Sequence, residues 1–369
     1  MWWRVLLPAA EPLAAAKFVG DEGCSASSCH GGGAGDKGND AYTRWLKQDV
    51  HLRAVVTLGN ARSKQIAAAA KLGNPLTEKA CTLCHAPLTH VPAALQRAPL
   101  EISRGLSCES CHAPAEPWLL SHTRADFTHA DRVQAGLRDL ANPYVRANQC
   151  VACHQAVPSR LLKAGHPKLI FELDGQTKSL PPHWREKPDW HPVGAWLAGQ
   201  AAAYRELCWQ LESEADGDPR VQQQADGLRW LLEHFGKLAT GLPVPPATDA
   251  PTSSKRKWAD ELAQAAAQFQ WPDNFARQAV KQLAGLSNEF TPEGTQLLLA
   301  RRAERLALAL DRLVASLPVA EKTRSLDASV SQLFESVQSL ADFDPQSFAG
   351  ALRKIAATVE PGSQVEPSR

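Results

Sequence analysis

The chain has 369 residues, and its 40 Lys and Arg residues nearly balance 39 Asp and Glu residues, giving a formal net charge of +1. This balance argues against a nucleic-acid partner, because phosphate binding requires a basic surface. The sequence also lacks a run of about eighteen apolar residues, which argues against a membrane-spanning helix. The length favours two domains.

The first sixteen residues combine one Arg, an apolar run at 5–7 and three alanines at 14–16. A positive charge, an apolar stretch and small residues are the parts of a secretory signal peptide, although this segment is short for one. We therefore expect residues 1–16 to be a truncated signal segment or the product of a misplaced start, and we exclude them from the fold.

Eight of the nine cysteines lie between residues 24 and 153, and Cys208 follows them alone. They form four pairs, and a histidine directly follows the second cysteine of each pair. Three pairs have two residues between the cysteines, whereas the first pair has four. The four groups are Cys24, Cys29 and His30; Cys81, Cys84 and His85; Cys108, Cys111 and His112; and Cys150, Cys153 and His154.

The repeated CxxCH pattern is the attachment signature of c-type heme. Two thioether bonds hold the porphyrin edge, and a histidine next to the second cysteine can turn under the ring to bind iron. Disulfides and zinc sites also use paired cysteines, but neither needs a histidine after every second cysteine. We interpret the longer first motif as a variant of the same site. The sequence thus predicts four covalently attached heme c groups, numbered 1 to 4 along the chain, each with its adjacent histidine as proximal ligand.

The sequence resembles the tetraheme cytochrome c-554 family over residues 17–200. The resemblance rests on Lys17-Phe18-Val19-Gly20 before heme 1, Trp45 and His51 after it, residues 105–112 at heme 3, Trp118 and His122 beyond, and residues 165–169 and 171–173 after heme 4. Two features depart from the family. Residues 158–160 stand where relatives often carry another histidine, and a further C-terminal CxxCH of some relatives is missing.

Histidines other than the proximal four supply the candidates for the sixth iron ligand. The resemblance implies that His51 binds heme 3 and that His122 binds heme 1. The apolar surroundings of His166 favour it as a ligand of heme 4 over heme 2. Each of these three has the alternative interpretation of a surface or capping histidine. Iron with histidine on both faces suits electron transfer, whereas iron with one free face can bind a small molecule.

Heme 2 leaves two alternatives open. In the best-known family member the corresponding heme is five-coordinate. Here His183, His129 or His191 would fill the sixth position, whereas His90 lies too close to His85 for an easy approach. If the position is open, heme 2 becomes the only plausible catalytic centre. The candidates for a proton donor or anion clamp there are His90, His129, Arg97 and Arg104.

The predicted fold is mainly α. Residues 17–191 form a loop-rich multiheme cytochrome domain with few or no strands, in which porphyrins supply most of the apolar core. Residues 192–369 form an all-α, bundle-like region without heme motifs. Its helices are expected at 193–215, from there to about Thr240, from Thr291, and from Pro345, with a linker at 243–254. Cys208 is interpreted as a buried free thiol.

We expect a tetraheme c-type cytochrome that passes single electrons between redox partner proteins. By the resemblance, heme attachment places it in the periplasm or another extracytoplasmic compartment. The alternative is a heme-dependent oxidoreductase that converts nitric oxide, nitrite or hydroxylamine at heme 2. A third interpretation is a structural or sensor subunit, and peripheral contact with a membrane is left open.

Overall fold

A computed structural model describes residues 16–33, 39–101, 103–188, 190–214, 218–291 and 296–359. The signal segment expected at 1–16, except Ala16, lies outside these residues, as do Pro292 and Glu293 of one predicted helix start. The described residues are mainly helical, and their β structure is one isolated parallel bridge between Phe18 and Gln96. The prediction of a mainly α fold is confirmed.

The chain divides into two compact units. The first contains residues 1–140 and 180–185, and the second contains residues 141–179 and 186–369. The first three cysteine motifs therefore lie in the first unit and the fourth lies in the second. This division differs from the predicted boundary at residue 192, which follows the change in composition, because the helix that carries the fourth motif packs among the helices of the second unit.

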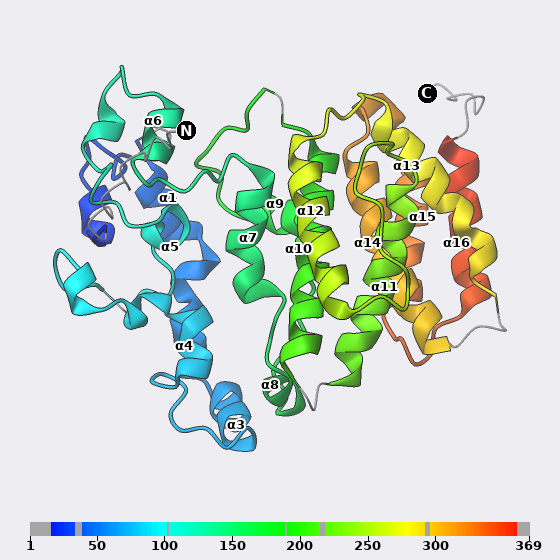
Figure 1. Ribbon diagram of the computed structural model, residues 1–369, viewed down its shortest axis with the longest axis horizontal. Coiled ribbons are helices and arrows are strands. Elements are labelled where there is room, and N and C mark those ends of the chain that lie inside the picture. The colour runs from blue at the N-terminus through cyan, green and yellow to red at the C-terminus, as the bar shows by residue number, and fades with distance from the viewer. Residues whose placement is uncertain are drawn as a thin grey trace, which may run out of the picture. The chain divides into compact units, whose positions relative to one another are not determined.

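Short helices and loops make up the first unit (Figure 1, blue to cyan). In the described part of this unit, five short 3-10 turns lie between or beside the α-helices, the second of them at Val50–Arg53. The α-helices are α1 (Ala41–Gln48), α2 (Ala54–Leu58), α3 (Ala61–Ala69), α4 (Lys79–His85), α5 (Cys108–His112) and α6 (His129–Gln134).

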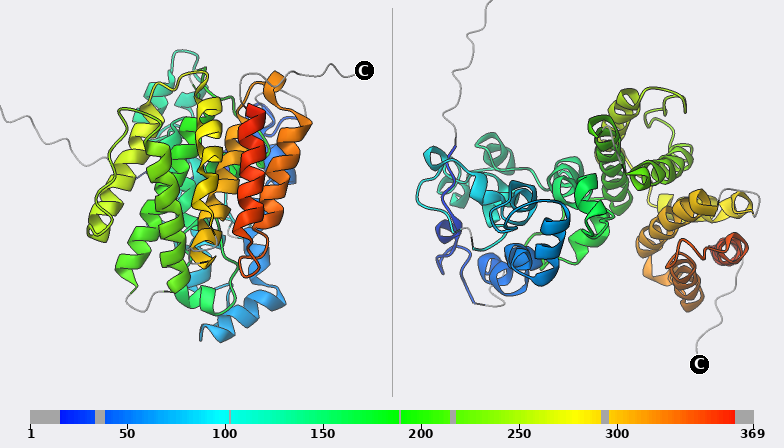
Figure 2. Two further views of the ribbon diagram at one scale, coloured as in Figure 1. Left: turned by 90° about the vertical axis from the view of Figure 1, so that its right-hand side faces the viewer. Right: turned by 90° about the horizontal axis from the view of Figure 1, so that it is seen from below.

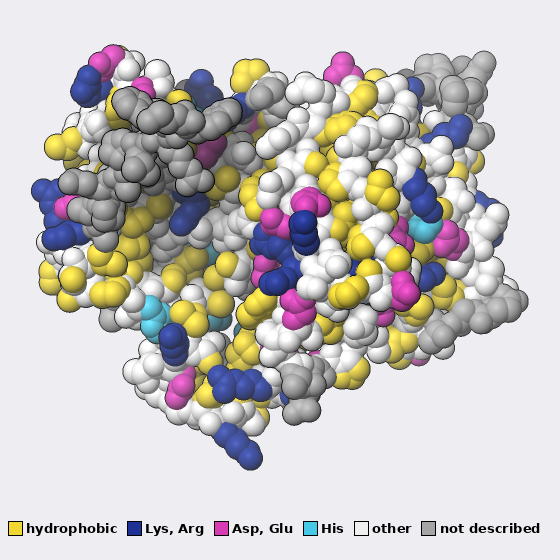
Figure 3. Space-filling view, viewed as in Figure 1, with side chains coloured by type: hydrophobic (Ala, Val, Ile, Leu, Met, Phe, Trp, Pro, Cys, Tyr) yellow, Lys and Arg dark blue, Asp and Glu magenta, His cyan; other side chains and the backbone are white. Residues whose placement is uncertain are grey.

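The first unit has few buried apolar side chains. Among its described residues these are Trp45, Leu58, Ala67, Ala86, Leu88, Ala115 and Trp118, and three of the seven are alanine. Several apolar side chains are instead exposed, including Val50, Val56 and Leu120. On the face drawn in Figure 3, apolar side chains gather on the surface of this unit. So small a core agrees with a unit whose apolar contacts come mainly from bound porphyrins.

The second unit is built from longer helices, several of which run side by side (Figures 1 and 2). They are α7 (Pro143–His154), α8 (Ser159–Lys163), α9 (Leu173–Lys178), α10 (Pro192–Ser213), α11 (Pro219–Gly236), α12 (Thr252–Gln268), α13 (Phe275–Ala284), α14 (Gln296–Ala315), α15 (Arg324–Ser336) and α16 (Pro345–Val359). A continuous cluster of buried apolar side chains, beginning at Ala147, connects α7, α9 and the helices from α10 to α16. No helix within the described ranges is both long and apolar enough to cross a bilayer.

Helix α10 is the central element of the second unit, since it packs against α7, α9, α11 and α12. Its bounds and those of α11 and α16 agree with the sequence prediction to within a few residues. Asp218 caps α11 by accepting a hydrogen bond from the Arg220 backbone, and Pro219 opens the helix. The linker predicted at 243–254 ends three residues earlier than expected, because α12 already begins at Thr252.

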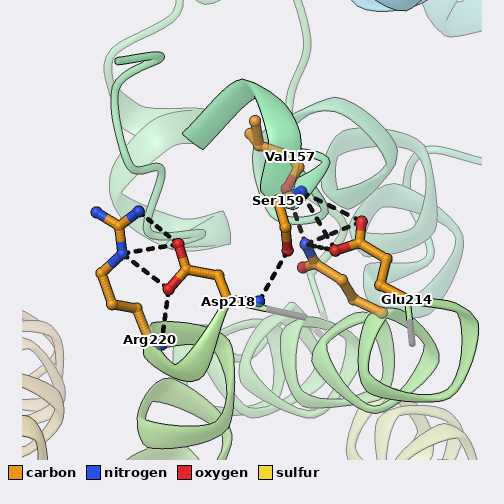
Figure 4. Close-up of polar contacts among 6 residues, drawn as sticks. Val157, Ser159, Glu214, Asp218 and Arg220 are labelled. Carbon is orange, nitrogen blue, oxygen red and sulfur yellow. Dashed lines mark hydrogen bonds and ion pairs between the residues drawn. The ribbon is translucent and has the colours of Figure 1, made fainter. Parts of the chain in front are cut away.

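Polar contacts fix the segment that follows the fourth cysteine motif. The Ser159 backbone N–H donates to both carboxylate oxygens of Glu214 at 3.2 Å, and the Asp218 backbone N–H donates to Ser159 Oγ at 3.2 Å (Figure 4). Gln210 Nε2 donates to the Val157 carbonyl at 2.8 Å. The loop after α7 is therefore held by the end of α10 and the start of α11.

Candidate heme-binding site

All eight motif cysteines are half-buried thiols rather than disulfides. Three of the motifs end a helix, because α4 ends at His85, α5 at His112 and α7 at His154. Residues three apart on a helix share one face, so each CxxC pair presents both thiols on the same side. The histidine at the helix end can then turn beneath a group that the two thiols hold.

In the first motif a tight loop, rather than a helix, brings the two cysteines and the following histidine together. The backbone N–H groups of Cys29 and Gly31 both donate to the Ala26 carbonyl, at 2.9 and 3.0 Å. A Cβ at position 31 would lie 1.8 Å from the Ser25 carbonyl oxygen, so this turn requires glycine. The four residues between Cys24 and Cys29 are thus folded back, and His30 directly follows the loop.

The first and third motifs are neighbours. Interaction with the Cys108 thiol lowers the pKa of Cys24, and interaction with Cys24, together with burial, raises the pKa of Cys108. Two porphyrins attached here would therefore have neighbouring edges. The sequence shows each motif but gives no sign that these two meet.

Glu109 explains why the first and third motifs lie together. Its side chain is 2% exposed and lies between the two cysteines of the third motif. The carboxylate accepts backbone hydrogen bonds from Val19, Gly20 and Ala115 at 2.7 to 3.1 Å. Gly20 has φ +82°, a conformation that glycine adopts readily. The segment leading to Cys24 is thereby fixed to helix α5.

The rings of His30 and His122 lie with their centres 6.0 Å apart and their planes 17° from parallel. Bonds from imidazole nitrogen to a metal are roughly 2 Å long, so two imidazoles on opposite sides of one metal have ring centres roughly 6 Å apart. His122 Nδ1 lies 3.1 Å from the Trp118 carbonyl oxygen, which orients the ring. This geometry agrees with the predicted role of His122 at heme 1.

The rings of His112 and His183 form a second pair, with centres 6.2 Å apart and planes at 73°. His183 lies in the segment 180–185, which belongs to the first unit although the chain on both sides of it belongs to the second. Arg44 holds this segment by donating to the Pro182 carbonyl at 2.8 Å. Burial lowers the pKa of His112 to about 4, which keeps its imidazole neutral, as a metal ligand must be. From the sequence, His183 was a candidate ligand for heme 2 only.

The ring nitrogen that contacts an oxygen indicates which histidines are suited to bind iron. A ligand to iron commonly uses Nε2, while its Nδ1–H donates to an oxygen. In five histidines Nδ1 lies 2.9 to 3.1 Å from an oxygen: His51 (Asp49 Oδ1), His85 (Ala54 O), His122 (Trp118 O), His166 (Pro167 O) and His183 (Pro181 O). In His90 and His129 the engaged nitrogen is Nε2, which lies 2.8 Å from Thr82 Oγ1 and 2.9 Å from Asp139 Oδ1. These two are therefore poorly arranged as iron ligands.

His51 has a carboxylate partner. Burial raises the pKa of Asp49, but hydrogen bonds from the His51 side chain and backbone outweigh it and hold that pKa below its usual range. A carboxylate behind a histidine is a common arrangement at metal sites. The assignment of His51 to heme 3 stays a prediction, and His183 provides a second candidate there.

The fourth motif is packed into the second unit. His154 ends α7, which lies against α10, and Gln176 Nε2 is 3.4 Å from His154 Nδ1. Exchanging the amide oxygen and nitrogen of Gln176 would turn this contact into a hydrogen bond from Nδ1–H. His166, predicted for heme 4, is half-buried in the same unit.

These residues fit heme in three respects. The thiols occur in pairs on one face, the proximal histidines follow them, and two proximal histidines have a second imidazole at the distance that one iron requires. In addition, Trp118 Nε1 is buried beside His122 without a hydrogen-bond partner among the described residues, and it suits an acceptor such as a heme propionate.

The family model described as cytochrome c554 and c-prime matches residues 23–113. This segment contains the first three motifs, and over these residues the match confirms the resemblance seen in the sequence. The matched segment is thus similar to c-type cytochromes, a class that carries covalently attached heme. The resemblance beyond residue 113 stays a prediction. No curated protein and no solved structure gives a match.

Proposed function

Because residues 23–113 carry the cytochrome c554 family pattern, we propose that the chain is a tetraheme c-type cytochrome that transfers single electrons between redox partner proteins outside the cytoplasm. Heme supplies the one-electron chemistry, and the chain supplies attachment, axial ligands and spacing. The proximal ligands are His30, His85, His112 and His154.

The structural observation that best supports electron transfer is that two proximal histidines each have a second imidazole at about the distance that one iron requires. We assign His122 to heme 1 and His183 to heme 3 on the ring separations of 6.0 and 6.2 Å. His166 is retained for heme 4. His51, with its carboxylate partner Asp49, is assigned to the one sixth position that remains, at heme 2. Histidine on both faces favours electron transfer over binding of substrate.

The proximity of the Cys24 and Cys108 thiols, which shift each other's pKa, supports transfer between hemes. Each thiol anchors one porphyrin edge, so hemes 1 and 3 would be neighbours and an electron would pass between them without an intervening protein layer. The buried Glu109 maintains this arrangement by fixing the segment before Cys24 to α5. The distance between hemes 1 and 3 would therefore be set by the backbone hydrogen bonds of Glu109.

The spin state of the ferric holoprotein tests the proposal. We expect low-spin electron paramagnetic resonance signals and no change in the spectrum of the reduced protein when carbon monoxide or nitric oxide is added. A high-spin signal that responds to nitric oxide would instead favour the oxidoreductase alternative at heme 2. Heme that is extracted by acidified acetone would contradict covalent attachment and overturn the proposal itself.

A further inference from the structure

A buried charge cluster lies in the second unit, beside the fourth cysteine motif. Glu172 precedes α9 and is 9% exposed, and its Oε1 accepts a hydrogen bond from Gln200 Nε2 at 2.7 Å. Its Oε2 has no hydrogen-bond partner among the described residues. Arg305 on α14 is 1% exposed, and none of its three guanidinium nitrogens has a partner within the same described ranges.

The other charged groups of this cluster are paired. Asp174, on α9, lies 2.7 Å from Lys178 and 3.9 Å from Arg312. On α14, Glu304 pairs with Lys168 at 3.0 Å and with Arg301 at 3.1 Å, and Asp311 pairs with Arg312. Helix α10 faces Glu172 with the neutral Gln200. Glu172 and Arg305 are thus an electrostatic pair that no direct hydrogen bond joins.

Hydrogen bonds connect the Glu172 segment to the proximal ligand of heme 4. On one side of Glu172, the Phe171 backbone N–H donates to Gln155 Oε1 at 3.3 Å, and Gln155 directly follows His154. On the other side, the Gln176 amide contacts His154 Nδ1. The segment is closely packed, since a Cβ on Gly199 would lie 2.7 Å from Leu173 Cβ. The carboxyl group therefore has a fixed position near this ligand.

The carboxyl group of Glu172 titrates near neutral pH. Burial raises its pKa to about 7, although Arg305 and Arg312 oppose the shift. A buried carboxyl group gains a proton more readily when a nearby positive charge is lost, because charges in the protein interior are poorly screened.

We propose that Glu172 is a proton-binding site coupled to reduction of the heme attached at Cys150 and Cys153. The inference rests on the function proposed above. One electron comes from the redox partner and removes one positive charge at the site. One proton then comes from solvent and converts the Glu172 carboxylate into the neutral acid. Oxidation reverses both transfers, so electron and proton balance.

Potentiometric titration of the holoprotein between about pH 5 and pH 9 tests this coupling. We expect one of the heme potentials to fall as the pH rises around pH 7, by up to ~59 mV per pH unit, the slope for one proton and one electron. In E172Q that potential should become independent of pH and stay near its low-pH value, since glutamine resembles the neutral acid. E206Q, the same change on α10 at a pair with Arg205, should keep the dependence.

A dependence that persists in E172Q overturns the inference, as does a potential that is independent of pH in the unmodified protein. If E172Q does not fold, the redox-difference infrared spectrum of the unmodified protein decides. A carboxylic acid C=O band that appears on reduction supports the coupling, and its absence overturns it. Both results presuppose attached heme, so failure of the proposed function is recognised separately by the lack of covalent heme.

Discussion

The imidazole of His183 lies opposite that of His112, with a ring-centre separation of 6.2 Å, although the two residues are separated by the whole fourth cysteine motif and helices α7 to α9. Residues 180–185 return to the first unit, and His183 lies within them. If His183 binds the iron of heme 3, that iron would link residues 180–185 to the third cysteine motif, which lies far away in the sequence.

Replacing His183 with alanine should convert the heme at Cys108 and Cys111 from low-spin to high-spin, because its iron loses one axial ligand. Electron paramagnetic resonance of the ferric protein measures the change. His129→Ala is the matched control, since that ring is 46% exposed and its Nε2 is occupied by Asp139. A His183→Ala protein that stays fully low-spin would contradict the assignment of His183 to heme 3.

His122→Ala should produce a separate high-spin signal from the heme at Cys24 and Cys29. The expectation follows from the 6.0 Å separation between the His30 and His122 rings. His90→Ala is the control, because His90 Nε2 bonds to Thr82. Unchanged spectra for His122→Ala would refute this ligand assignment.

Glu109→Gln should lower the free energy of unfolding of the first unit by about 3 kcal/mol, since the buried carboxylate accepts three backbone N–H groups and an amide cannot satisfy all of them. Denaturant titration followed by heme absorption measures the loss. Glu116→Gln should cost less than about 1 kcal/mol, because Glu116 is exposed and, within the described ranges, accepts only from the Lys17 backbone. An equal loss of unfolding free energy in the two variants would show that the buried hydrogen bonds of Glu109 stabilise the unit no more than the exposed one of Glu116.

Gly105→Ala should destabilise the first unit by about 2 kcal/mol or more, because the added Cβ would lie 2.4 Å from the His51 carbonyl oxygen. Gly285→Ala is the matched change in the second unit. No heavy atom lies within 4 Å of its added Cβ, and its φ of −64° is helical, so we expect stabilisation of up to about 1 kcal/mol. Thermal unfolding measures both, and a Gly105→Ala protein as stable as the unmodified one would be incompatible with this close approach.

Cys208 should resist iodoacetamide in the native holoprotein at about pH 8. It is 1% exposed, and burial raises the pKa of its thiol to about 11, so little thiolate forms. In denaturant the matured chain should take up one label, because thioether bonds protect the other eight cysteines. More than one label would mean that a motif lacks heme.

The sequence predicted the parts of this protein that depend on local pattern. The CxxCH motifs, the mainly α fold and the bounds of α10, α11 and α16 follow from residue spacing, caps and proline positions. It did not predict the packing of α7 into the second unit, because Ala147 and Val151 face helices that come much later in the chain.

Contacts between distant residues account for what the sequence missed at the site. The meeting of Cys24 and Cys108 depends on Glu109, whose three backbone donors cannot be read from the motif. The Glu172 cluster was missed for a similar reason, because Arg305 occurs in a leucine-rich helix where arginine usually marks the solvent face. The prolines at 181 and 182 mark His183 in the sequence as part of a loop. Only the fold shows that its ring lies near that of His112.

The intact mass of the matured, denatured chain tests the central claim most directly. Four thioether-bound hemes require the mass to exceed that of the polypeptide by four heme units. A gain of three units, with Cys24 and Cys29 still free to react, would contradict the interpretation of the longer first motif, and no gain would contradict the assignment as a c-type cytochrome.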